Sequence, residues 1–136
     1  MTADLLARML FGHLVGDYLL QPNWMALHKK KRFSIACLHC AVWTGSVLLF
    51  VPELLTVRTV IAVFASHLLL DATGIVNRWL NLIGSRSMEN AHAFCEADHP
   101  ELHKRFMIAY TALVQTVADN TLHLLALYAI VKFMRP

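Results

Sequence analysis

Four long apolar segments constrain the fold of this chain more than any other feature. They cover residues 5–27, 33–51, 57–82 and 106–133, and a helix needs about 20 predominantly apolar residues to cross a bilayer. Hydrophobic residues make up 57% of the 136 residues and charged residues only 15%, which leaves little chain for a separate soluble domain. The sequence therefore predicts an all-α, polytopic membrane bundle of about four transmembrane helices, with residues 1–136 as a single domain.

The first apolar segment differs from the others because a proline interrupts it. Pro22 follows Gln21, and a proline removes a backbone donor and kinks or ends a helix near that point. A signal peptide has a basic stretch before its apolar segment and a small-residue cleavage site after it. This segment has no such basic stretch and no clean cleavage site. We therefore expect a retained helix that is interrupted near Pro22, with a re-entrant segment as the alternative.

The distribution of lysine and arginine predicts how the helices are oriented. Short loops rich in these residues stay in the cytoplasm. Segments 29–32 and 84–105 are thus predicted to be cytoplasmic, with both termini outside, and 84–105 is a polar loop of soluble character. This asymmetry accounts for the net charge of +3, so we expect no nucleic-acid partner. The residues on the basic side are Lys29, Lys30, Lys31, Arg32, Arg78, Arg86, Lys104 and Arg105, against Arg8, Arg58, Lys132 and Arg135.

The three cysteines indicate packing more than a zinc site. Cys37 and Cys40 form a lone C-x2-C pair inside a predicted helix, and Cys95 lies far from them in the sequence. A structural zinc site of this kind needs a second pair at matched spacing. We therefore interpret the pair as small apolar packing residues.

Polar residues inside the apolar segments recur at intervals of four. Residues four apart lie on the same face of a helix, so each set forms a polar stripe that can point into the bundle. The first and last stripes read H-x3-D-x3-Q and Q-x3-D-x3-H, so like residues meet at similar depth on antiparallel helices. The stripes comprise His13, Asp17 and Gln21; the lone His39; His67 and Asp71; and Gln115, Asp119 and His123.

These intramembrane ionisable groups need a compensating partner. Each costs on the order of 3 kcal/mol at mid-membrane, and together they cost about 10 kcal/mol or more. His–Asp pairs that only link helices by hydrogen bonds are one explanation. Imidazole nitrogens and carboxylate oxygens are also ligands of zinc, manganese and iron, and two such ions about 3.5 to 4 Å apart activate water in hydrolytic sites. The predicted ligands are His13, Asp17, His39, His67, Asp71, Asp119 and His123.

The longest motifs in the chain are "GHLVGDYLLQPNWMALHKKK", the histidine of "LHC", "SHLLLDATG" and "ADNTLHLLALY". They resemble the successive motifs of domain-of-unknown-function family thirty-three-oh-seven, which comprises small membrane proteins of bacteria and phages. The resemblance spans nearly the whole chain and implies a location in the bacterial inner membrane, but it implies no activity. Asn120 stands where the family usually has glutamine. This difference affects only the supporting role expected of position 120 and not the predicted ligands.

Metal-assisted hydrolysis is the leading functional hypothesis. A metal-bound water would be the nucleophile, and Asp17, Asp71 or Asp119 would be the catalytic base. The substrate would be a phospho-ester or a lipid-linked group. The expected partners are membrane lipid and either further copies of the chain in a homo-oligomer or the subunits of a larger membrane complex. Alternatives are a proton or cation relay, a haem protein, which would not need the aspartates, and an accessory subunit with a structural polar core. The residues expected to support the ligands are Gln21, Gln115 and Asn120.

The polar loop raises a separate possibility. His99 and His103 lie four apart near Pro100, where the last helix is expected to begin because proline suits a first turn. A second metal site is one interpretation, and a solvated loop at the membrane interface is the preferred one. The candidate residues are His92, Cys95, Glu96, Asp98, His99 and His103.

Overall fold

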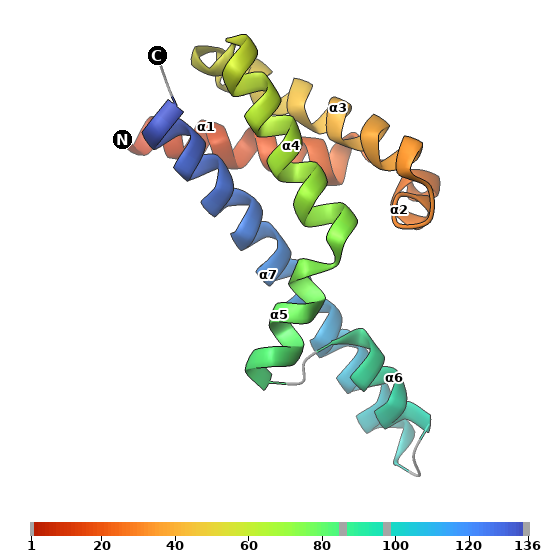
Figure 1. Ribbon diagram of the computed structural model, residues 1–136. Helices are drawn as coiled ribbons and strands as arrows, with labels where there is room; N and C mark the ends of the chain where they lie inside the picture. Colours follow the sequence, from red (N-terminus) through yellow and green to blue (C-terminus); the bar gives the residue numbers. More distant parts are fainter. Residues whose placement is uncertain (1, 85–86, 97–98, 135–136) are drawn as a thin grey trace. The chain divides into compact units, whose positions relative to one another are not determined.

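The computed structural model describes residues 2–84, 87–96 and 99–134, and every regular element in these ranges is a helix (Figure 1). The predicted all-α fold class is therefore confirmed. In chain order the helices are α1 (Ala3–Leu14), the π-helix η1 (Val15–Leu19), α2 (Asn23–His28), α3 (Phe33–Phe50), the 3-10 helix η2 (Pro52–Leu54), α4 (Val57–Thr73), α5 (Ile75–Gly84), α6 (Met88–Glu96) and α7 (Glu101–Met134).

The chain divides into two compact units. The first comprises Met1–Thr73 and His123–Pro136, and the second comprises Gly74–Leu122. Among the described residues, two helices, α3 and α7, are long and apolar enough to cross a membrane, and the bent pair of α4 and α5 makes a third if it is one broken span. A fourth span through α1 and η1 is compatible with these helices and stays a prediction.

The first unit buries ionisable side chains next to an apolar cluster and exposes large aliphatic side chains on its outer faces. Its four buried histidines, at positions 13, 39, 67 and 123, are at most 1% exposed, whereas Leu49 on the outer face of α3 is 79% exposed and Leu69 on α4 is 56% exposed. A water-soluble domain buries its large aliphatic side chains and exposes its ionisable ones. Buried histidines together with exposed leucines are what a lipid environment favours, because polar side chains in membrane proteins face the bundle interior.

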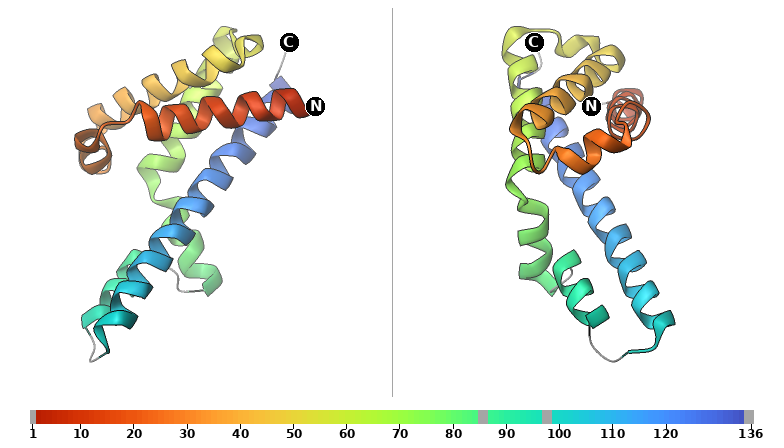
Figure 2. Two further views of the ribbon diagram at one scale, coloured as in Figure 1. Left: turned by 180° about the vertical axis from the view of Figure 1, so that it is seen from behind. Right: turned by 90° about the vertical axis from the view of Figure 1, so that its right-hand side faces the viewer.

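Helices α1 and α3 lie side by side in the first unit (Figure 2). Two glycines on α1 and η1, four residues apart, permit this close approach: a Cβ at Gly12 would lie 2.9 Å from Val47 Cα, and one at Gly16 would lie 2.7 Å from Trp43 Cδ1. Small residues at this spacing let membrane helices pack closely. Ser46 Oγ also donates to the Gly12 carbonyl over 2.8 Å. The first polar stripe is thereby held against α3.

Replacement of Gly16 by alanine is expected to lower the free energy of unfolding by about 1 to 3 kcal/mol, because the added methyl group overpacks the contact with Trp43. Gly45→Ala is the matched control, since a Cβ at Gly45 meets no atom within 4 Å. That variant should be as stable as the parent or more stable, by up to about 1 kcal/mol of helix propensity. Thermal unfolding in detergent measures both, and equal midpoints for the two variants would contradict the packing argument.

The predicted interruption of the first segment is confirmed, and a π-helical turn accompanies it. Leu20 N–H donates to the Val15 carbonyl, five residues earlier, over 3.0 Å, and Pro22 then begins α2 from an extended conformation. π-helical turns within helices are frequent at functional sites. Asp17 lies in this turn, so its direction is set by η1 and not by the regular spacing of α1.

Two other segments differ from the expectation. The segment 57–82, a predicted membrane span, is divided into α4 and α5 at Gly74, which has φ +63°, because a glycine in the left-handed region ends a helix readily. The predicted loop 84–105 contains α6. Ser87 Oγ accepts from Asn90 N–H over 3.3 Å, which is a helix N-cap that supplies a partner for an otherwise unsatisfied donor.

Candidate metal centre

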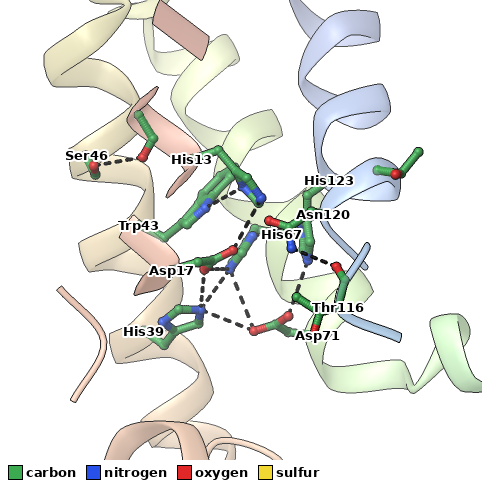
Figure 3. Close-up of polar contacts among 12 residues, drawn as sticks. His13, Asp17, His39, Trp43, Ser46, His67, Asp71, Thr116, Asn120 and His123 are labelled. Carbon is green, nitrogen blue, oxygen red and sulfur yellow. Dashed lines mark hydrogen bonds and ion pairs between the residues drawn. The ribbon is translucent and has the colours of Figure 1, made fainter. Parts of the chain in front are cut away.

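A cluster of histidine and aspartate side chains lies in the interior of the first unit (Figure 3). Its members come from α1 and η1, from α3, from α4 and from the C-terminal part of α7, so four separate stretches of the chain supply it. The sequence predicted these stripes but not which of their residues meet. The side chains are His13, Asp17, His39, His67, Asp71 and His123.

Asp17, His39 and His67 form the first group with metal-ligand geometry. His39 Nε2 lies 2.9 Å from His67 Nε2 and 3.2 Å from Asp17 Oδ1, and His67 Nε2 lies 3.6 Å from the same oxygen. Ligand atoms that are each about 2.1 Å from a tetrahedral zinc ion are about 3.4 Å from one another. The three side chains can therefore hold one ion with little movement.

His67, Asp71 and His123 form the second group. His67 Nδ1 lies 2.9 Å from His123 Nδ1, while Asp71 Oδ1 lies 3.4 Å from His123 Nε2 and Asp71 Oδ2 lies 3.7 Å from His67 Nε2. Because His67 belongs to both groups, they are parts of one continuous cluster. The cluster can bind a metal ion, and its donor set suits zinc, manganese or iron.

The surroundings of the Asp17 carboxylate also favour a bound cation. Its Oδ1 is buried, and no well-directed hydrogen bond from the described residues reaches it, although His39 Nε2 is only 3.2 Å away. A buried acceptor left without a partner costs about 1 to 3 kcal/mol, and more when it is charged. A cation held between Asp17 and the two imidazoles would remove this cost.

Lys29 contacts the cluster, although no pattern in the sequence predicts this contact. Its Nζ lies 2.6 Å from Asp71 Oδ2 and 3.2 Å from His39 Nε2. With its amide group turned to the orientation that satisfies both neighbours, Gln21 lies between Lys29 and Asp17: it donates to the Asp17 backbone carbonyl over 3.0 Å and accepts from Lys29 Nζ over 3.3 Å. A supporting role for Gln21 stays a prediction. Lys29 was assigned to a basic loop because it begins a run of four cations, and no spacing signal distinguished it from its neighbours.

Trp43 was also missed, although it follows His39 by four residues on the same helix face. Its indole stacks on His67, with ring centroids 3.9 Å apart and planes at 13°, and its Nε1 donates to His13 Nδ1 over 3.1 Å. His13 Nε2 in turn lies 3.6 Å from Asp17 Oδ2. His13 is thus placed beside Asp17 to orient it, and it belongs to neither of the two ligand groups found among the described residues.

The last predicted stripe is divided between the two units. His123 lies in the first unit, whereas Gln115, Asp119 and Asn120 lie on the part of α7 that belongs to the second. Within the second unit Asn120 Nδ2 donates to the Thr116 carbonyl over 2.7 Å. A ligand role for Asp119 and supporting roles for Gln115 and Asn120 stay predictions.

The polar loop forms no ligand group among the residues that the structure describes. His99 stacks on Phe94 with centroids 4.0 Å apart, and Cys95 Sγ donates to the Lys104 carbonyl over 3.6 Å. Asp98 lies outside the described residues. The three cysteines at positions 37, 40 and 95 are free thiols.

Comparison with known proteins supplies a family and no activity. The model of a family described as "Protein of unknown function (DUF3307)" matches residues 5–135 of the chain. No curated protein and no solved structure matches the chain. The matched range includes every residue of the cluster, from His13 to His123. The chemistry of the centre therefore has to be argued from its own geometry.

Proposed function

We propose, for a chain that belongs to the DUF3307 family of proteins of unknown function, that it is a membrane protein which binds one or two divalent transition-metal ions. The observation that carries this proposal is the mutual spacing of Asp17, His39 and His67, whose donor atoms lie 2.9 to 3.6 Å apart. Three buried donors at these distances match the coordination shell of a single ion. A second ion would be held by Asp71 and His123, while His67, as a neutral imidazole with one free lone pair, would serve only one of the two ions.

The reaction we propose is metal-assisted hydrolysis of a phospho-ester or a lipid-linked group. A bound ion would supply Lewis-acid activation of a water molecule and of the substrate. The chain would supply the rest: His39 and His67 stay neutral to act as ligands, and Asp17 or Asp71 accepts the proton of the water. Gln21, through its bond to the Asp17 carbonyl, fixes the turn that carries this carboxylate. The hydrophobic surface around the bundle gives a lipid-borne substrate direct access to the protein.

The centre is proposed to open toward the basic segment that contains Lys29. Lys29 lies at the end of α2 and its Nζ contacts Asp71 directly, which places the cluster within one lysine side chain of that segment. The distribution of basic residues predicts that this side faces the cytoplasm of a bacterial cell. A substrate would then enter from the cytoplasm or from the adjacent leaflet.

A proton relay is the second candidate, and one observation favours it. His39, His67 and His123 form a chain in which adjacent imidazole nitrogens are 2.9 Å apart at both steps. Such a chain can pass protons, since each imidazole has one donor and one acceptor nitrogen in its neutral form. A relay and a metal centre use the same histidines, but a relay needs them free of metal and a metal centre needs them bound to it. The metal content of the purified protein therefore distinguishes the two functions.

Purification without chelators should yield about one or two equivalents of zinc, manganese or iron per chain, since the cluster offers two overlapping ligand groups. Elemental analysis measures this, and zinc or manganese added back to chelator-treated protein should raise its thermal midpoint. The metal-loaded form should release phosphate from a generic phosphomonoester and the stripped form should not. Metal below about a tenth of an equivalent, with no stabilisation on addition, would favour the relay or the structural explanation. Bound haem would show a Soret band.

A further inference from the structure

We propose that Lys29 is the anion-binding residue of the metal-loaded centre, and that the substrate reaches it through a phosphate group. This inference rests on the proposed function, because it concerns the state in which a metal ion is present. In the structure Lys29 pairs with Asp71. Once a divalent ion neutralises that carboxylate, the ammonium group becomes available to a negatively charged ligand.

The position of Lys29 fits this role. Its side chain is 15% exposed, whereas that of Asp71 is 5% exposed and that of His39 is fully buried. Lys29 thus lies between the deepest ligands and the outside of the unit. It is joined to the end of α2, where its backbone N–H donates to the Met25 carbonyl over 2.9 Å. The side chain can therefore turn from Asp71 toward an incoming group without unfolding a helix.

The charge of the centre requires an anion once metal is bound. Without metal, the carboxylates of Asp17 and Asp71 and the ammonium of Lys29 sum to about −1 when the imidazoles are neutral. One divalent ion changes that sum to about +1, and two ions change it to about +3. An uncompensated positive charge in the interior of a membrane bundle is strongly unfavourable. A phosphate dianion, which accepts hydrogen bonds from ammonium groups, would lower these sums to about −1 with one ion and about +1 with two.

The neighbourhood of Lys29 also favours anions. Lys30, Lys31 and Arg32 follow it directly, and all three are exposed. Clustered cations raise the local concentration of anionic ligands. Lys29 differs from these three residues because its ammonium group contacts the cluster. Substitution of Lys29 or of a neighbouring lysine can therefore separate direct contact with a bound anion from long-range attraction of anions.

The test is a calorimetric titration of manganese into the chelator-treated full chain, with and without inorganic phosphate. We expect phosphate to strengthen manganese binding about tenfold in the parent protein, since two ligands that stabilise the same charge arrangement couple reciprocally. Lys29→Met should reduce this coupling to below about twofold, and Lys29→Arg should retain part of it. Lys30→Met is the matched control: it removes an exposed neighbouring charge and should keep most of the coupling.

A second arm distinguishes a lipid phosphate from a free one. The same titration is carried out in nanodiscs of phosphatidylcholine with and without phosphatidic acid. Coupling to phosphatidic acid but not to inorganic phosphate identifies a lipid headgroup as the source, and the reverse identifies a free phosphate compound. Coupling that persists in Lys29→Met, or that is absent from the parent protein in both arms while manganese still binds, overturns the inference alone. If the parent protein binds no manganese, the proposed function fails together with it.

Discussion

Replacement of His67 by phenylalanine is expected to abolish metal binding and to leave the bundle folded. His67 belongs to both ligand groups, so its loss removes a donor from each. The phenyl ring keeps the stacking on Trp43, where the ring centroids are now 3.9 Å apart, and it fills the space of the imidazole. Loss of a group that supports a ligand typically lowers metal affinity about 10- to 100-fold. Loss of a ligand itself should cost more, so we expect the metal affinity to fall about 100-fold or more.

Two measurements distinguish this expectation from the structural explanation. Elemental analysis of His67→Phe should show metal below about a tenth of an equivalent, and added zinc should no longer raise the thermal midpoint. His99→Ala is the control, because His99 contacts Phe94 outside the cluster and should leave metal content unchanged. If the histidines are structural links only, the parent protein is metal-free and His67→Phe unfolds at lower temperature. Asp119→Asn in the same assay tests the predicted ligand role of Asp119, since the amide keeps the shape but loses the anionic donor.

Replacement of Asp71 by asparagine should lower the free energy of unfolding of the metal-free protein by about 3 to 5 kcal/mol. The substitution removes the carboxylate that Lys29 contacts at 2.6 Å and leaves an ammonium group in the bundle without its counter-charge. It also removes a ligand from the second group, so bound metal should fall as well. Lys29 is partly exposed. If its ammonium group moves toward the outside, the loss of unfolding free energy should be close to the lower value of about 3 kcal/mol.

The double variant Asp71→Asn with Lys29→Met separates the two effects. Removing both charges should restore most of the stability, because no unpaired ion is left in the interior. Metal binding should stay weak, because the carboxylate ligand is still missing. Urea or thermal unfolding of the parent, the two single variants and the double variant gives the coupling energy of the pair. A double variant as unstable as Asp71→Asn alone would show that Lys29 and Asp71 do not stabilise the fold as a pair.

The sequence by itself determined the helical class, most helix positions and the residues most deeply buried in the centre. The apolar segment 33–51 became α3 (Phe33–Phe50), because the length and apolar character of a helix that crosses a membrane are local properties. Spacing by four placed His67 and Asp71 on one face of α4 for the same reason. Four of the predicted histidines are buried, at positions 13, 39, 67 and 123.

Tertiary structure alone decided which stripes meet and which residues complete them. The π-helical turn η1 sets the direction of Asp17, and the close packing at Gly12 and Gly16 brings it to His39. Lys29 reaches Asp71 across 42 positions of sequence, which no local periodicity can reveal. Spacing along a helix fixes a face, but contacts between helices depend on how closely their backbones approach and where each helix is broken. These are properties of the packed bundle, and the centre exists only where four separate stretches of chain come together.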